Sequence, residues 1–270
     1  MSRIGEAFER LRSKGRGGFI PFITAGDPEM NTSLKLALEL ADGPADIVEL
    51  GVPFSDPMAD GPSIQASSMR ALKNGADLQM IVGMVKEIRK SSEVPIVLFS
   101  YVNPLLRYGV DRLADDAARA GIDGMLVVDA IEDDVAAISS ALAQRGVDLI
   151  SLVAPTTSDE RLRSIAANAE GFIYAVSRAG VTGTGSESPG SAAELVRRTR
   201  AVTDLPIAVG FGISSQEQVA EVWEYADAAV VGSAIVNEIE RSIGRPDLVD
   251  LVGKFARSLV PAVAKPIGES

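Results

Sequence analysis

Glu49 is the residue whose type and position most clearly indicate chemistry. It lies within the run DIVELGV (46–52), between the apolar residues Val48 and Leu50. In a strand, Ile47 and Glu49 would point to the same side. An ionised carboxylate there loses hydration, which costs several kcal/mol unless it is paired or neutralised. Glu49 is therefore either a structural side chain hydrogen-bonded inside the fold or a general acid and base with a raised pKa, and we favour the second interpretation.

A long loop, GVPFSDPMADGPSIQ (51–65), follows Glu49 and contributes Asp56 and Asp60. Asp commonly accepts hydrogen bonds from backbone N–H groups in turns, and this role explains Asp56 best. The loop is long enough to return over Glu49, so Asp60 suits a turn and a binding role equally well. A divalent-metal site built from Asp46, Glu49, Asp56 and Asp60 is a further alternative, although these residues follow no recognised metal-loop spacing.

Three glycine-rich loops late in the chain indicate a phosphate site. They are SRAGVTGTGSESPG (177–190), GFGISS (210–215) and GSAIVNE (232–238). Glycine lets backbone N–H groups approach a phosphate closely, and a helix N-terminus adds partial positive charge. A tight turn explains any one glycine, but three successive loops favour phosphate. The candidates are Gly183, Gly212, Gly232 and Ser233. The first loop also has the composition of a lid, with a disordered connector as the alternative.

The composition limits which groups can do this chemistry. The 270 residues include no Cys and no His, and 26 Lys and Arg stand against 37 Asp and Glu, a net charge of −11. Thiolate nucleophiles, His triads and Cys- or His-ligated metals are excluded, which leaves carboxyl groups, Lys and Tyr for acid–base work. The acidic balance argues against nucleic acid and anionic membranes. Without a membrane-spanning run or a signal-like N-terminus, we expect a cytoplasmic protein.

Eight β-branched apolar runs must position these residues. They are nearly continuous rather than alternating, which is typical of parallel strands covered on both faces. The runs are 18–24, 46–52, 94–101, 124–129, 147–153, 171–177, 205–211 and 227–233. Amphipathic helical segments lie between them, including about 111–120, 132–145, 158–168, 191–203 and 214–225, a helix capped by Asp77, and one with Leu34, Leu38 and Ala41 on a face and Gly43 at its end.

Eight such units predict a closed (β/α)8 TIM barrel that forms a single domain over residues 1–270. An extra N-terminal helix, with Ile4, Phe8 and Leu11 on one face, and a helical addition at 246–260 would complete it. The alternative is an open doubly wound sheet, whose first turn should carry G-x-G-x-x-G; here that turn is TAGDP (24–28). In a barrel, the loops that follow the strands meet at one face, so the carboxyl groups and late glycines should converge there.

Aromatic side chains near the ends of the predicted strands suggest an apolar pocket beside these groups. Core packing explains each of them singly. They are Phe22, Phe99, Tyr101, Tyr174 and Phe211.

The segments PFITAGDP, ELGVPFSDPMADGPSIQ, SRAGVTG, GFGIS and GSAIV closely resemble the signature segments of the tryptophan synthase α subunit family. The resemblance covers nearly the whole chain in order. It implies a (β/α)8 barrel that cleaves indole-3-glycerol phosphate to indole and glyceraldehyde 3-phosphate, with Glu49 and Asp60 as catalytic residues. It also implies phosphate contacts from Gly183, Gly212, Ile213, Gly232 and Ser233, and an indole pocket and lid from Phe22, Phe99, Tyr101, Tyr174, Thr182 and Phe211.

The same resemblance implies a β-subunit partner in an αββα assembly. That partner would use pyridoxal phosphate to join indole to serine, while this chain would carry no cofactor and no metal. Two alternatives are a catalytically weak subunit that mainly binds and activates the β subunit, and a phosphosugar isomerase on a related barrel. The presence of both Glu49 and Asp60 favours the lyase over the first, and ELGVPFSDP-x-ADGP favours it over the second.

Overall fold

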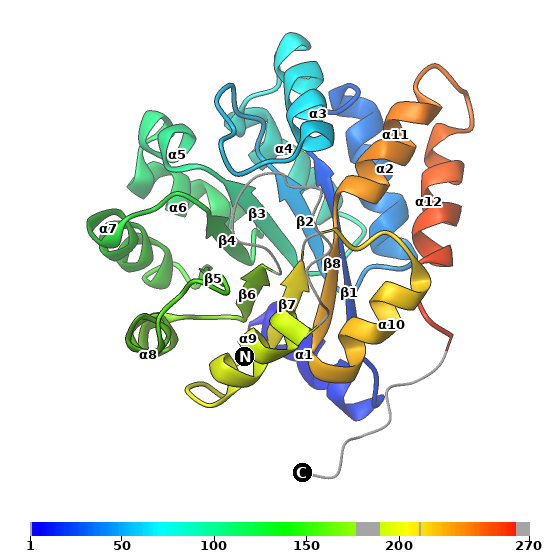
Figure 1. Cartoon of the computed structure of the whole chain (residues 1–270). Helices are drawn as coiled ribbons and strands as arrows, with labels where there is room; N and C mark the ends of the chain where they lie inside the picture. The colour runs from blue at the N-terminus through cyan, green and yellow to red at the C-terminus, as the bar shows by residue number, and fades with distance from the viewer. Residues whose placement is uncertain (1, 177–189, 211, 263–270) are drawn as a thin grey trace.

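The computed structural model describes residues 2–176, 190–210 and 212–262. Parallel strands form a closed barrel in sequence order, and β8 pairs with β1 (Figure 1). The strands are β1 (Gly18–Thr24), β2 (Val48–Gly51), β3 (Ile96–Ser100), β4 (Gly124–Val127), β5 (Asp148–Val153), β6 (Ile173–Val176), β7 (Ile207–Gly210) and β8 (Ala228–Val231). Each strand lies within one of the eight predicted runs. The TIM barrel is confirmed, and the open sheet is wrong.

Helices surround this barrel (Figure 1). They are α1 (Arg3–Ser13), α2 (Met30–Asp42), α3 (Pro62–Lys73), α4 (Leu78–Ile88), α5 (Val102–Tyr108), α6 (Val110–Ala120), α7 (Glu132–Ala143), α8 (Asp159–Asn168), α9 (Gly190–Arg200), α10 (Gln216–Tyr225), α11 (Ser233–Ser242) and α12 (Leu248–Ser258). Asp77 caps α4, as predicted, by accepting the Met80 N–H at 2.8 Å. The predicted C-terminal addition is α12, which packs against α2 and α11.

The N-terminal helix closes one end of the barrel. Ile4, Phe8 and Leu11 of α1 are buried, as their spacing predicts, in a cluster with inward-facing strand residues. The Phe8 ring lies 5.7 Å from that of Phe172, which directly precedes β6. Because α1 fills the end at which the strands begin, the opposite end remains for a site.

Acidic side chains fix the strands in pairs at the end where they begin. The pairs are β1 with β2, β3 with β4, β5 with β6, and β7 with β8. In each pair, the carboxylate of an acidic residue just before the second strand accepts a hydrogen bond from a backbone N–H near the start of the first strand. The backbone N–H of the same acidic residue donates to the carbonyl oxygen of that first-strand residue. The carboxylate-to-N–H distances are 2.9 Å for Asp46 and Phe19, 2.7 Å for Asp123 and Ile96, 3.4 Å for Glu170 and Leu149, and 2.9 Å for Asp227 and Ile207. Asp46 is therefore structural and also pairs with Arg16 at 2.6 Å, so the metal site that included it is wrong.

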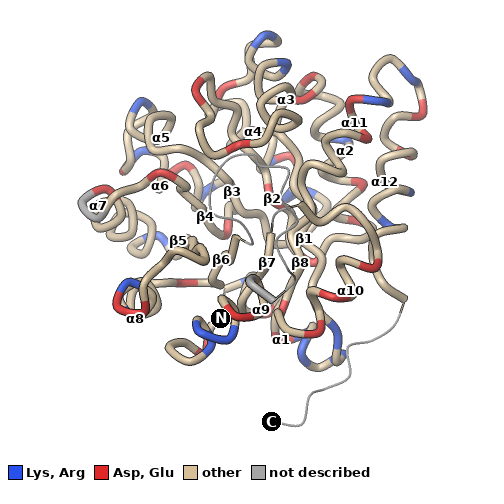
Figure 2. The backbone as a smooth tube through the Cα atoms, viewed as in Figure 1, with Lys and Arg blue, Asp and Glu red and all other residues tan. Residues whose placement is uncertain are grey.

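Charged residues lie mainly on the helices and loops around the barrel (Figure 2). Glu49, on β2, is buried. Among the residues that the structure describes, no helix is both long and apolar enough to cross a membrane.

Candidate active site

Glu49 lies inside the barrel, as the second residue of β2. Its Cα pairs with those of Phe22 on β1 and Val97 on β3. Ile47 belongs to the cluster inside the barrel, and strand alternation directs Glu49 to the same side. The Glu49 side chain therefore points into the barrel and not toward the helices around it. The residue is 2% exposed. Burial, with a smaller contribution from the negative charge of Asp60, raises the pKa of Glu49 to about 8, so its carboxyl group is mostly protonated at pH 7.

Asp60 lies in the loop between β2 and α3 and is 6% exposed. The loop does return over Glu49. Asp60 is close enough for its negative charge to raise the pKa of Glu49, and the charges of both residues raise the pKa of Tyr174. Burial raises the pKa of Asp60 to about 6, while a hydrogen bond from Tyr101 acts in the opposite direction. Asp60 is thus mostly ionised at pH 7, when Glu49 is mostly protonated. The different surroundings of the two side chains therefore make Glu49 a proton donor and Asp60 an anion at the same pH.

Tyr101 follows β3 and holds the loop that carries Asp60. Its hydroxyl donates to Asp60 and accepts the Ala59 N–H at 3.0 Å. Burial raises the pKa of Tyr101, so the hydroxyl keeps its proton for this bond. Its ring packs on Phe54 of the same loop, with centroids 5.0 Å apart. The sequence predicted Tyr101 as part of an indole pocket; in the structure its described contacts are with the loop that carries Asp60.

Aromatic rings from three strands lie near the carboxyl groups. Phe22 and Phe99 meet edge to face, with ring centroids 5.6 Å apart. Tyr174, on β6, is buried, and burial together with the charges of Glu49 and Asp60 raises its pKa well above the usual value. The predicted aromatic residues on β1, β3 and β6 therefore lie near the two carboxyl groups, and rings of this kind suit a planar apolar ligand.

Two glycines that the sequence analysis did not single out make room for these rings. A Cβ on Gly51 would lie 2.4 Å from Phe22 Cζ, and one on Gly210 would lie 2.3 Å from the Tyr174 hydroxyl oxygen. The sequence contained information that could have identified Gly51. It lies two residues after Glu49 in the same strand and therefore faces the barrel interior as Glu49 does.

Gly212 and Gly232 lie just after the ends of the neighbouring strands β7 and β8. Gly210 pairs with Val230 between β7 and β8, and Gly212 and Gly232 each lie two residues further along. Gly212 has a φ of +74°, which favours glycine. Gly232 is the N-cap of α11, whose free N–H groups suit an anion. We call Gly212, Ile213, Gly232 and Ser233 the glycine cradle.

The remaining predicted site residues, Thr182, Gly183 and Phe211, lie outside the described residues, as does the predicted lid up to residue 189.

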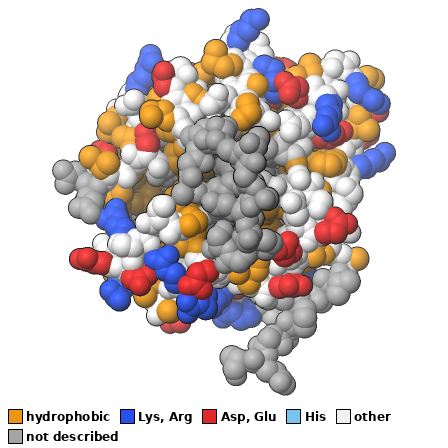
Figure 3. Space-filling model, in the orientation of Figure 1, with side chains coloured by type: hydrophobic (Ala, Val, Ile, Leu, Met, Phe, Trp, Pro, Cys, Tyr) orange, Lys and Arg blue, Asp and Glu red, His pale blue; other side chains and the backbone are white. Residues whose placement is uncertain are grey.

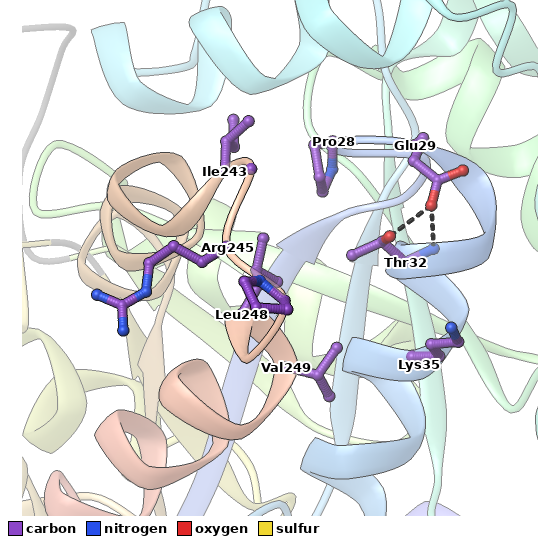
Figure 4. A pocket seen from close by; sticks show the side chains of 10 residues that line it. Pro28, Glu29, Thr32, Lys35, Ile243, Arg245, Leu248 and Val249 are labelled. Atoms are coloured by element: carbon purple, nitrogen blue, oxygen red, sulfur yellow. Dashed lines mark hydrogen bonds between the residues drawn. The ribbon is translucent and has the colours of Figure 1, made fainter.

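Away from these groups, a groove of about 700 Å³ lies outside the barrel. It runs between the start of α2 and the segment that joins α11 to α12, and is lined by Thr32, Lys35, Ile243 and their neighbours (Figure 4). Glu29 caps α2 there by accepting the Thr32 N–H at 2.9 Å. None of the predicted site residues lines this groove. The described residues also contain no group of three acids that could hold a metal ion.

The closed barrel and the paired carboxyl groups together are typical of a (β/α)8-barrel enzyme whose carboxyl groups are suited to acid–base chemistry. The chain belongs to the tryptophan synthase alpha chain family, whose sequence model matches residues 8–253.

Individual relatives agree over nearly the full length. The chain is 46% identical over 265 residues to the tryptophan synthase alpha chain of Citrifermentans bemidjiense, covering 98% of this chain and 99% of the relative. The crystal structure of the alpha subunit from Legionella pneumophila superposes with a TM-score of 0.87 at 35% identity, covering 96% and 97% of the two chains. A structure of Mycobacterium tuberculosis tryptophan synthase gives 0.86 at 37% identity, covering 96% and 99%.

Proposed function

We propose that this chain cleaves indole-3-glycerol phosphate to indole and glyceraldehyde 3-phosphate by a retro-aldol reaction. The observation that carries this proposal is the pair of buried carboxyl groups, Glu49 and Asp60, whose pKa values of about 8 and about 6 lie on either side of neutrality. Family membership supports the substrate, and the rings around the pair suit its indole.

Glu49 is the proposed acid because an indole carbanion is a poor leaving group. Indole C3 must gain a proton before its bond to the glycerol chain can break. The protonated Glu49 carboxyl supplies that proton, and its carboxylate then removes the proton of the hydroxyl on the adjacent glycerol carbon. As the aldehyde forms, the electron pair of the broken bond returns to the ring. Glu49 ends the cycle protonated, so it serves as acid and then as base.

Asp60 is the proposed stabiliser of the protonated ring. Positive charge develops on the indole nitrogen when C3 is protonated. A hydrogen bond from the ring N–H to an ionised carboxylate becomes stronger as this charge develops. Tyr101 holds Asp60 for this role. The glycine cradle would bind the phosphate at the far end of the substrate, and this remote binding would orient the indole between the carboxyl groups.

These steps use side chains of the chain itself, and we propose that it needs neither a metal nor pyridoxal phosphate. Pyridoxal phosphate would belong to a β-subunit partner that receives the indole and joins it to serine, in an αββα assembly. We also propose a cytoplasmic location, since a phosphorylated substrate is charged and crosses a bilayer poorly.

An exposed apolar surface supports the partner. Met58, Leu106 and Ile131 are 83%, 54% and 67% exposed, and they follow β2, β3 and β4. Hydrophobic side chains are visible on this face in the region of α5 to α7 (Figure 3). Large exposed apolar side chains on the segments that follow the strands are candidates for contact with another protein. We call these three residues the apolar rim.

Replacing Leu106 and Ile131 of the apolar rim by Ser should weaken binding of the β subunit by about 10- to 100-fold, because buried apolar anchors dominate interface energies. Indole release by the isolated chain should stay within about twofold of the parent, since neither residue belongs to the acid–base pair. Titration calorimetry measures the first effect. Ile243→Ser is the matched control, because Ile243 is an exposed apolar residue that lines the groove of Figure 4. Unchanged affinity in the double variant would remove the apolar rim from the interface.

The function itself is tested by measuring indole released from indole-3-glycerol phosphate, with and without a β subunit. We expect release in both conditions. A chain that releases no indole in either condition, yet still stimulates the β subunit, would be the catalytically weak activator instead. The retained acid–base pair at Glu49 and Asp60 favours the lyase.

A further inference from the structure

Arg70 joins three segments that lie far apart in the sequence. From α3, its guanidinium donates to the two carboxylate oxygens of Asp27 at 2.8 and 3.0 Å, and to Glu240 at 2.7 Å. Asp27 lies in the loop after β1 and is 1% exposed, while Glu240 lies on α11. Burial raises the pKa of Asp27, and the Arg70 bonds act in the opposite direction. One cation therefore ties the loop after β1, α3 and α11 together.

The helices α3 and α11 carry the two halves of the proposed site at their N-termini. α3 begins at Pro62, two residues after Asp60, and α11 begins in the glycine cradle. Their first turns are close, because Ile64 Cδ1 lies 3.7 Å from where a Cβ on Gly232 would be. Near their C-termini, the ion pair between Arg70 and Glu240 joins them again. The helices are thus connected at both ends.

Arg70 acts from outside the site. It lies six residues after Ile64, which is about 9 Å along a helix at a rise of 1.5 Å per residue. Between these residues, Ser67 shares a hydrogen bond of 2.6 Å with Thr24 at the end of β1, and both hydroxyls are buried. α3 is therefore anchored to the barrel wall at Ser67, and the Arg70 bonds restrain how its far end sits against α11.

We propose that Arg70 is a positioning residue, which keeps Asp60 in register with the glycine cradle so that a bound phosphate directs the indole N–H onto Asp60. This inference rests on the proposed function. Binding energy from a remote phosphate raises kcat only if the framework between the two contacts is rigid. The ties between α3 and α11 supply that rigidity.

The variants must separate this role from folding. Arg70→Met leaves the Asp27 carboxylate buried without its cation and risks unfolding the chain. Glu240→Ala is the better test, because Glu240 is half exposed and the paired bonds between Arg70 and Asp27 remain. Glu238→Ala is the matched control, since Glu238 lies on the same helix and pairs with Arg241 of α11 itself.

Two measurements test the proposal. In Glu240→Ala, kcat for indole-3-glycerol phosphate should fall about tenfold while KM changes less than about twofold, because positioning is lost and phosphate binding is kept. In the parent, saturating glycerol 3-phosphate should tighten indole binding by about fivefold or more, and this coupling should disappear in Glu240→Ala but persist in Glu238→Ala.

An unchanged kcat in Glu240→Ala, a change in KM alone, or coupling equal to that of the parent would overturn the role of Arg70. So would a parent chain that shows no coupling. These outcomes differ from failure of the proposed function, in which the parent chain itself would release no indole.

Discussion

Glu49→Gln should lower the rate of indole release by about 10³-fold or more, because general acid–base catalysis contributes about 10²–10⁴-fold and Glu49 serves as both acid and base. Gln keeps the shape of the side chain but has no proton of suitable acidity to give to indole C3. The thermal midpoint should stay the same or rise slightly, since burial already opposes ionisation of Glu49. Stopped or continuous indole assays with purified protein measure the rate.

A surface substitution controls for handling and charge. Glu87→Gln on α4 removes an exposed carboxylate that pairs with Lys90, and its turnover should equal that of the parent. If Glu49→Gln turned over at a near-normal rate, Glu49 would be the structural side chain that the sequence left as its alternative.

Asp60→Asn should lower kcat by about 10²- to 10³-fold, the usual cost of removing one group that stabilises charge in the transition state. Affinity for glycerol 3-phosphate should change little, because the glycine cradle is intact. Asp56→Asn in the same loop is the matched control, since Asp56 is exposed while Asp60 is buried. Equal losses in kcat and in affinity would mean that Asp60 supports binding in general and does not act selectively in the transition state.

The architecture could be predicted because most residues on both faces of the strands are buried. That burial produces apolar runs that the sequence displays directly, and the alternation from Ile47 to Glu49 directs a carboxyl group inward. Helix faces were less certain. The spacing of Leu34, Leu38 and Ala41 marks a face of α2, but the fully buried face carries Leu36, Ala37 and Leu40. Their helix packs against strands on one side and other helices on two more, so apolar residues occur over most of its surface.

Contacts between distant segments could not be predicted. The bond from Tyr101 to Asp60, the space at Gly51 for the Phe22 ring, and the link from Arg70 to Glu240 each depend on which strands and helices become neighbours. No local period or spacing records such a pairing. Local features did single out Glu49 as a candidate, because an acid within an apolar strand is visible in the sequence. They left Asp60 even between a turn and a binding role, and only the family resemblance favoured a catalytic role for it. How their pKa values differ follows from burial and from Tyr101, which only the folded chain defines.

The proposed chemistry requires that Glu49 is protonated at pH 7 beside an ionised Asp60. Infrared difference spectroscopy of the parent against Glu49→Gln tests this requirement by titrating the Glu49 carboxyl group directly. The protonated carbonyl band should be present at pH 7 and disappear as the pH rises through about 8. In Asp60→Asn it should disappear at lower pH, because the negative charge that helps to raise the pKa of Glu49 is gone. A Glu49 that is already ionised at pH 7, with a pKa near that of an ordinary Glu, would contradict the proposed chemistry.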